Sequence, residues 1–243
     1  MLFLLPARAK WGNLQNNQVL GGAGDVLTAA LLQDQHILDA HTELAGDIDA
    51  GLGGDNGIDR HGHMVIGRSI GSLKHFKADT VADRLGLVAI ADDSGLEVNA
   101  LGNRPGIYSS RYADDWESLP GETRDQRNCR KLLKELENVP YAQRHARFVC
   151  CMAAVKPGYY EPEDTLVVQG TWEGRILNEP IGDNGFGYDP VFCDIALGVS
   201  NAQLSVEEKN ARSHRGNALR SLLACWAEWM QTPPVHKPQP LEP

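Results

Sequence analysis

The stretch that most clearly indicates the fold is Val88-Ala89-Ile90-Ala91-Asp92-Asp93-Ser94-Gly95-Leu96-Glu97-Val98. Residues 88–91 form a continuous apolar run, which is typical of a buried strand, and residues 96–98 alternate as a half-buried strand does. The Asp-Asp-Ser-Gly sequence between them has the composition of a turn. The stretch therefore predicts two strands that flank a carboxylate corner, and α/β proteins commonly bind their ligands at such strand ends.

Further elements are expected after this stretch. A helix is predicted from about residue 123 to 138, because four apolar residues recur at helical spacing between positions 129 and 136. Ser205 with Glu208 three residues later is a capping-box pattern that predicts a short helix, and a second helix is expected from about Ser213. That second helix has one apolar face, made of Leu219, Leu222, Leu223, Trp226 and Met230. Strands are expected at residues 148–155, 165–170, 175–177 and 190–193.

Composition excludes several classes of protein. The chain has 243 residues, 42% of them hydrophobic, which suffices for one substantial core. A net charge of -9 disfavours a surface that neutralises polynucleotide phosphates, so we expect no nucleic-acid complex. The five cysteines form no Cys-x-x-Cys pair, and adjacent Cys150 and Cys151 lie in an apolar run, which indicates reduced core thiols. We expect a cytoplasmic protein without a signal peptide or a membrane span.

Both ends of the chain differ from the middle. Residues 1–86 contain glycine clusters and no sustained apolar face, so we treat them as a divergent N-terminal region of uncertain order. His61 and His63 in this region are compatible with a metal site, although histidines in such a segment are more often solvated loop residues. The compact domain is expected over residues 87–230, and the proline-rich residues 231–243 are expected to form a flexible tail.

Two clusters of side chains suit phosphate chemistry. Asp92 and Asp93 offer the oxygen ligands that Mg²⁺ prefers, but both side chains can equally cap backbone N–H groups in a turn. Lys209, His214 and Arg215 surround the predicted start of a helix, where backbone N–H groups and the helix dipole attract anions. The alternative for this second cluster is a solvated basic patch between two helices.

A third candidate is the glycine-rich stretch Gly182-Asp-Asn-Gly-Phe-Gly-Tyr-Asp-Pro-Val-Phe192. Phe186, between two glycines, is placed to stack on a flat ring, and Tyr188 and Asp189 can supply polar contacts. The alternative is a tight turn into the strand at residues 190–193, in which Tyr188 and Asp189 only pack the turn.

Taken in order, these segments resemble one enzyme family. The resemblance covers about residues 88–230 and includes 101–112, which read Leu-Gly-Asn-Arg-Pro-Gly-Ile-Tyr-Ser-Ser-Arg-Tyr, and the Ala146-Arg147-Phe148 strand start. The chain is similar to the non-canonical purine nucleoside triphosphate pyrophosphatases, which act on inosine and xanthosine triphosphates. The resemblance implies an α/β fold with a mixed central sheet flanked by helices, and two lobes with a nucleotide cleft between them.

The same resemblance implies a mechanism. Asp93 would be the general base and a ligand of Mg²⁺, and the products would be a nucleoside monophosphate and pyrophosphate. His214 and Arg215 would contact the 6-keto oxygen of inosine or xanthosine, and the protein would be a homodimer. The implied substrate contacts are Ser94, Phe186, Gly187, Tyr188, Asp189, Lys209, His214 and Arg215.

The N-terminal region departs from the family pattern. Family members open with a strand and a Thr/Ser-x-Asn-x-x-Lys loop that grips the phosphates, and this chain has no such loop before residue 90. They also carry a metal-binding glutamate, whereas Glu43 is the only glutamate before residue 90. Three interpretations remain open: a replaced or mistranslated N-terminus, which we favour, a diverged lobe with substitute ligands, and a catalytically impaired nucleotide-binding relative.

Overall fold

The computed structural model describes residues 2–5, 82, 86–159 and 161–238. The predictions that concern Glu43, His61 and His63 lie outside these residues. The described strands form one sheet in the order β1-β2-β4-β5-β6, and β3 also pairs with β2. Their bounds are Leu2–Leu5 for β1, Val88–Val98 for β2, Arg104–Gly106 for β3, His145–Val155 for β4, Leu166–Ile176 for β5 and Phe192–Asp194 for β6.

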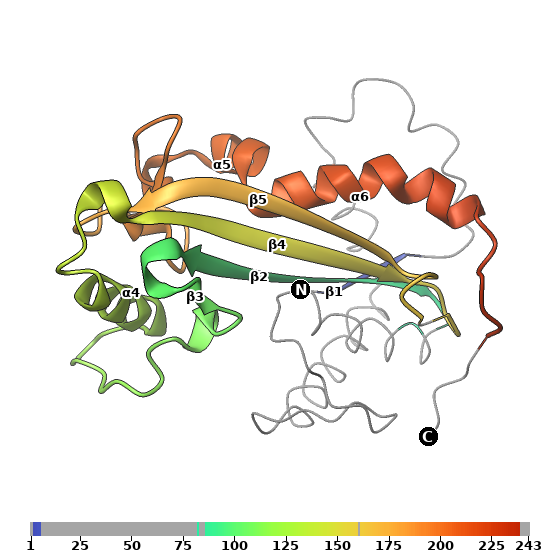
Figure 1. The fold of residues 1–243 in the computed structure, drawn as a ribbon, viewed down its shortest axis with the longest axis horizontal. Coiled ribbons are helices and arrows are strands. Elements are labelled where there is room, and N and C mark those ends of the chain that lie inside the picture. The colour runs from blue at the N-terminus through green and yellow to red at the C-terminus, as the bar shows by residue number, and fades with distance from the viewer. Residues whose placement is uncertain (1, 6–81, 83–85, 160, 239–243) are drawn as a thin grey trace.

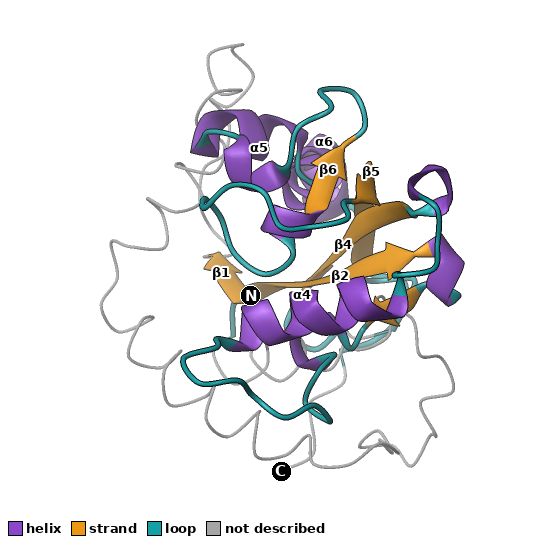
Figure 2. Cartoon of the chain, turned by 90° about the vertical axis from the view of Figure 1, so that its left-hand side faces the viewer, coloured by secondary structure: helices purple, strands orange, loops and turns teal. Residues whose placement is uncertain are grey.

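Helices and sheet together confirm the predicted α/β class. Every pairing among the described strands is antiparallel, so the mixed sheet that we expected is not seen in this part of the chain. Figure 1 shows the long strands β2, β4 and β5 running side by side, with helix α6 over one end of them and helix α4 at the other. Figure 2, which looks along these strands, shows α4 below them and β6 and α5 above them.

The predicted turn at residues 92–95 is wrong. β2 runs without interruption from Val88 to Val98 and pairs one-to-one with β4, from Ala89 opposite Val155 to Val98 opposite Ala146. The polar residues 92–95 stay in the strand because an apolar strand continues opposite them and completes their backbone hydrogen bonds. The two aspartates therefore lie in the middle of a strand and not at its end.

β5 joins two predicted strands, 165–170 and 175–177, into one. The predicted strands left out residues 171–174, but the structure continues through them, and Gly170 and Gly174 each allow a close approach. A Cβ at Gly170 would lie 2.2 Å from the carbonyl oxygen of His214, and one at Gly174 would lie 2.4 Å from the ring of Phe192. These glycines are positions of tight packing within a continuous strand.

The predicted helices are confirmed. α4 (Arg124–Glu135) begins after Thr123, whose side chain forms a capping box with Gln126. α5 (Val206–Arg212) begins with the predicted capping box of Ser205 and Glu208, and α6 (His214–Gln231) follows it. Short 3-10 turns connect the elements: Asn99–Leu101, Ser109–Arg111, Tyr141–Gln143, Asp189–Val191 and Asn201–Gln203.

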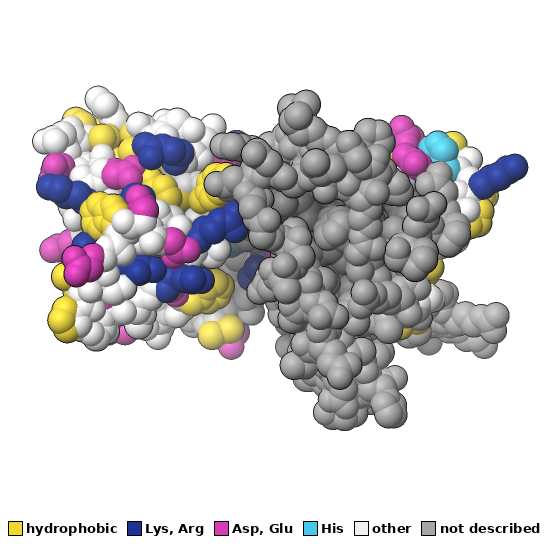
Figure 3. Space-filling view, turned by 90° about the horizontal axis from the view of Figure 1, so that it is seen from below, with side chains coloured by type: hydrophobic (Ala, Val, Ile, Leu, Met, Phe, Trp, Pro, Cys, Tyr) yellow, Lys and Arg dark blue, Asp and Glu magenta, His cyan; other side chains and the backbone are white. Residues whose placement is uncertain are grey.

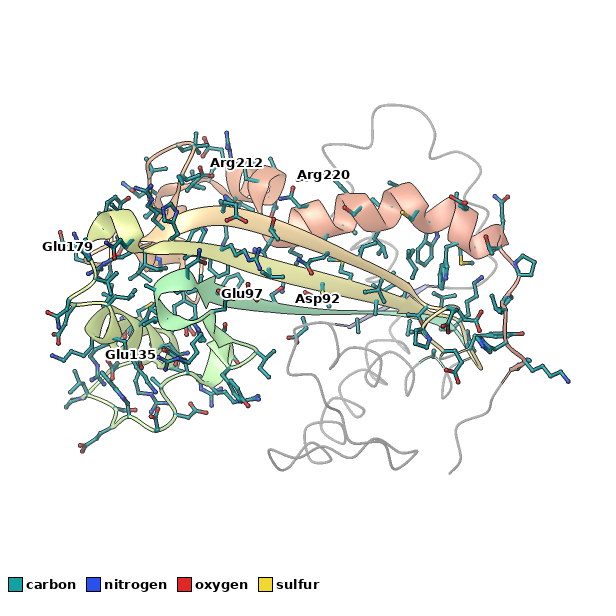
Figure 4. The ribbon with its side chains drawn as sticks, viewed as in Figure 1. Asp92, Glu97, Glu135, Glu179, Arg212 and Arg220 are labelled. Atoms are coloured by element: carbon teal, nitrogen blue, oxygen red, sulfur yellow. The ribbon has the colours of Figure 1, made fainter. Side chains whose placement is uncertain are left out.

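Two hydrophobic cores use one face of the twisted sheet. Leu96 and Val98 of β2 pack into a core that includes Leu132 of α4, and Val88 and Ile90 of β2 pack into a second core under α6. Because these four strand residues occupy alternate positions, they share a face. The two lobes expected from the resemblance correspond to these two cores. The residues that follow the same alternation between them are Asp92 and Ser94, so polar side chains mark the boundary (Figure 4 labels Asp92 there).

Most of the cysteines are buried, as predicted. Cys129, Cys150, Cys151 and Cys193 are buried free thiols, and Cys225 is an exposed free thiol. Among the described residues, no helix is long and apolar enough to cross a bilayer. Figure 3 shows Lys and Arg side chains interspersed with Asp and Glu on the described part of one face.

Part of the proline-rich tail is held to the domain. The backbone N–H groups of Val235 and His236 donate to the carboxylate of Asp164 at 2.5 and 3.1 Å, and the His236 ring lies 2.9 Å from the same carboxylate. The sequence did not predict these contacts, because a single aspartate gives no sign of a partner some seventy residues away. Residues 239–243 of the predicted flexible tail lie outside the described part.

Candidate active site

The glycine-rich loop is organised by Asp189. Its side chain is buried and accepts a hydrogen bond from the backbone N–H of Phe186 at 2.8 Å. Gly185 has φ +81°, and a Cβ there would lie 2.2 Å from the Asp189 carboxylate. Only glycine fits this position, because both the backbone conformation and the space exclude a side chain. The loop therefore presents the Phe186 ring outward, where it is 67% exposed.

Lys209 of α5 joins the loop to the following helices. Its ammonium group forms an ion pair with Asp189 and lies 4.5 Å from the centre of the Phe186 ring. A cation over an aromatic face is attracted by the ring quadrupole. The structure thus brings Phe186, Asp189 and Lys209 together, as the resemblance implied.

Tyr188 and Gly187, in the same loop, make contacts with other segments of the chain. The Tyr188 side chain is buried, and its hydroxyl donates to the carbonyl oxygen of Ser109 at 2.8 Å. The N–H of Gly187 donates to the carboxylate of Asp125 at 2.7 Å. For Tyr188 these contacts favour the interpretation in which the side chain packs the turn.

His214 begins α6 and lies flat against β4. Its ring stacks on Phe148, with centroids 4.9 Å apart and planes inclined by 15°. Its Nδ1 is buried without a hydrogen-bond partner in the described part of the chain. Burial, and then the positive charges of Arg215 and Lys209, lower the pKa of His214 to about 3, so the ring is neutral at pH 7.

Arg215 reaches from α6 to the middle of β2. Its Nε donates to Asp92 Oδ2 at 2.8 Å, and the Asp92 side chain is fully buried. Burial raises the pKa of Asp92, but neighbouring positive charge, including that of Arg215, outweighs it and holds this pKa below its ordinary value. Asp92 is therefore a carboxylate that pairs with Arg215.

Ser94 lies on the same face as Asp92, two residues further along β2. Its Oγ is buried and has no hydrogen-bond partner among the described residues. Buried polar atoms are almost always hydrogen-bonded. Ser94 Oγ and His214 Nδ1, both between the two cores, therefore point to a polar ligand.

Asp93 differs from the other predicted site residues in its direction. Because side chains alternate along β2, Asp93 faces the side of the sheet opposite to Asp92 and Ser94. It is half-buried, and its rung of the sheet is shared with Cys151. The structure does not bring its side chain onto the face that holds His214 and Arg215.

The described strands β1 and β3 pair with the two ends of β2. On the edge of β2 away from β4, β1 pairs with Val88–Ala91 and β3 pairs with Leu96–Val98. No described strand pairs with residues 92–95 on that edge, and Figure 1 shows β1 and β3 at separate ends of β2.

Sequence reasoning named Asp92 as a possible Mg²⁺ ligand or turn cap but missed its pairing with Arg215, and it did not identify Phe148 as part of the site. Asp92 was grouped with Asp93, and only the pairing of β2 with β4 separates the two carboxylates onto opposite faces. Phe148 carried the signal of an ordinary strand residue. Among the described residues, no three His, Cys, Asp or Glu side chains form a group that could hold a metal ion.

The sequence model of the Ham1 family matches residues 66–225. The chain belongs to the Ham1 family. Its curated relatives include a dITP/XTP pyrophosphatase of Nitratidesulfovibrio vulgaris, 58% identical over 62% of this chain and 70% of that protein. A dITP/XTP pyrophosphatase of Escherichia coli O157:H7 is 42% identical over 84% of this chain and 93% of that protein. The family match begins at residue 66, upstream of residues 88–230, over which the sequence resemblance was expected.

Solved Ham1 structures share the fold. The Ham1 protein of Staphylococcus aureus is 34% identical, with a TM-score of 0.59 over 81% of this chain and 95% of that one. The HAM1 protein of Coxiella burnetii is 39% identical, with a TM-score of 0.59 over 67% of this chain and 79% of that one. The expected α/β fold is therefore the fold of this family.

Proposed function

We propose that this Ham1 protein hydrolyses the non-canonical purine nucleoside triphosphates ITP, dITP and XTP to the nucleoside monophosphate and pyrophosphate. The observation that carries the proposal is the polar site between the two cores, where Ser94, His214 and Arg215 lie on the sequence segments shared with the family. The names of the curated relatives support the same reaction. They do not favour the alternative of a catalytically impaired nucleotide-binding protein.

The purine is bound by stacking and by donors. Phe186 supplies an exposed aromatic face, and Lys209, which now lies over it, moves aside to contact the nucleotide. Arg215 can only donate hydrogen bonds, so it suits the O6 of inosine and xanthosine. Adenosine presents an amino donor at this place, and the buried donors left unpaired cost about 1–3 kcal/mol each.

Hydrolysis is assigned to Asp93. The carboxylate accepts a proton from the attacking water as the water oxygen bonds to the α-phosphorus, and the anhydride bond to the β-phosphate breaks to release pyrophosphate. Asp93 faces the side of the sheet opposite to Asp92 and Ser94, so the proposal requires the phosphate chain to reach that side of β2.

The described residues fit Mg²⁺ in the limited way that this ion requires. Mg²⁺ is commonly held by one or two carboxylates together with substrate phosphates and water, so the single carboxylate of Asp93 suffices from this part of the chain. Asp92 is engaged by Arg215 on the other face and is not available as the second ligand. The bound ion would neutralise charge on the phosphates during hydrolysis.

The oligomeric state, the cellular location and the partners of the protein are part of the same proposal. We propose a homodimer in the cytoplasm that takes a purine nucleoside triphosphate as its substrate. The net charge of -9 and the mixed charges in Figure 3 argue against nucleic acid as a partner.

The test is to identify the products. The purified chain with ITP and Mg²⁺ should release IMP and pyrophosphate in equal amounts, and Asp93→Asn should release neither at a comparable rate. Release of orthophosphate and IDP would show a general phosphatase and refute the proposal. Binding of ITP without any release would support the impaired relative in its place.

A further inference from the structure

Asp92 has no part in the reaction described so far, yet it is buried and charged at the centre of the site. Its side chain is fully buried in β2, and its Oδ2 lies 2.8 Å from Arg215 Nε and 3.8 Å from Cys150 Sγ. Burying a carboxylate costs free energy unless it is paired. A pairing at this place therefore calls for a function beyond the stability of the sheet.

The geometry of the pair concerns one nitrogen of the guanidinium group. Arginine carries one N–H on Nε and four on its two terminal nitrogens, all in one plane. Asp92 accepts the hydrogen bond from Nε–H, and the terminal nitrogens of Arg215 make no hydrogen bond with a described residue. A bond at Nε restrains the plane of the guanidinium group and leaves terminal N–H groups to donate to another acceptor.

Arg215 needs such support because it is partly exposed. Its side chain has 37% relative exposure, whereas Asp92 is held rigidly by β-sheet pairing on the strand beneath. An unsupported arginine at a helix start samples many rotamers, and a solvated guanidinium loses its preference for one ligand atom. The hydrogen bond to Asp92 on β2 thereby restrains the side chain of Arg215 on α6.

We propose that Asp92 is a positioning residue for nucleobase selectivity: it holds the guanidinium of Arg215 by Nε so that the terminal nitrogens meet the 6-keto oxygen of the purine. The inference rests on the proposed function, since it concerns the same base-binding site. It separates the two adjacent aspartates by role, with Asp93 at the reacting phosphate and Asp92 behind the base. The substrate class that it selects is purine nucleotides with an acceptor at position 6.

The experiment compares kcat/KM for ITP and ATP in a set of variants. Asp92→Ala should lower the ratio of the two values by about tenfold or more, with the loss for ITP lying in KM rather than kcat. Asp92→Asn keeps an acceptor for Nε and should retain the ratio within about threefold. In the double variant with Arg215→Ala, the loss of Asp92 should have no additional effect on the ratio.

Two variants control for packing and for folding. Cys150→Ala removes the thiol contact to Asp92 Oδ2 but leaves the Arg215 hydrogen bond to that oxygen in place, so it should keep the ratio. Arg215→Lys keeps the charge but has no Nε, so it should lose selectivity as Asp92→Ala does, even if Asp92→Ala fails to fold. Its folding is checked by its thermal unfolding midpoint.

The outcomes distinguish this inference from the proposed function. If the unmodified protein releases no pyrophosphate from ITP, the proposed function itself fails. If the unmodified protein is active and selective while Asp92→Ala or Arg215→Lys keeps the full ITP to ATP ratio, only the role of Asp92 is overturned. A fall in kcat alone, with the ratio unchanged, overturns it as well.

Discussion

Gly170 lets α6 approach β5 closely, and a methyl group there should disturb the site as well as the fold. In Gly170→Ala the new Cβ would lie 2.2 Å from the His214 carbonyl oxygen and 2.3 Å from the Ala218 backbone nitrogen. Ordinary contacts are 3.4–4 Å, so the helix must move by more than 1 Å, because the atoms in conflict are backbone. Overpacking of this kind costs about 1–3 kcal/mol.

Both consequences of this substitution can be measured. A loss of about 1–3 kcal/mol lowers the thermal midpoint by about 3–9 °C in a domain of this size. α6 begins at His214, so the displacement moves His214 and Arg215, and a misplacement of 1 Å can reduce kcat/KM by about 100-fold. The assays are thermal unfolding by circular dichroism and pyrophosphate release from ITP.

The matched control is Thr171→Ala, the next residue of β5, whose side chain faces the side of the sheet away from α6. It should change the midpoint and kcat/KM far less. A Gly170→Ala variant with an unchanged midpoint and unchanged kcat/KM would refute the account of how β5 places the start of α6.

Three further predictions concern buried polar groups. The pKa of His214 is lowered in the folded chain, so below pH 6.5 the unfolded chain binds a proton at this residue and the folded chain does not. The free energy of unfolding should therefore fall by about 1–2 kcal/mol between pH 6.5 and 5. In urea unfolding, His214→Gln should show a smaller fall. An equal pH dependence in both proteins would contradict a neutral, buried ring. The buried Asn128 side chain accepts a hydrogen bond from the Ala113 N–H. Asn128→Ala should therefore lower the free energy of unfolding, measured in urea titrations, by about 1–3 kcal/mol. A loss below about 0.5 kcal/mol, on the order of a surface substitution, would show that this hydrogen bond does not stabilise the fold. Asp189→Asn removes the charge that pairs with Lys209, so the KM for ITP should rise and the thermal midpoint should fall, whereas unchanged values would show that Asp189 does not organise the loop.

The sequence predicted the elements whose signals are local. α4, α5 and α6 lie where apolar spacing and capping boxes placed them, because a helix forms from contacts within three or four residues. The resemblance implied that Phe186, Asp189 and Lys209 contact the substrate, and the structure brings the three side chains together.

The sequence did not predict features that depend on a distant partner. The Asp-Asp-Ser-Gly stretch has turn composition, and it stays in a strand only because β4 pairs with it across 50 or more residues. The predicted strands also omitted residues 171–174, because the close packing at Gly170 and Gly174 depends on α6 and on the Phe192 ring, which come from elsewhere in the chain. The separation of Asp92 from Asp93 is a consequence of strand register, which composition does not specify.

The central claim is that the polar site between the two cores selects 6-keto purine nucleotides for pyrophosphate release. The most direct measurement is kcat/KM of the unmodified chain for ITP, XTP, ATP and GTP with Mg²⁺, detected as pyrophosphate. One or two unpaired donors predict that ITP and XTP exceed ATP by about 5-fold to more than 150-fold. Equal values for ITP and ATP, or no pyrophosphate from a folded chain, would contradict the account.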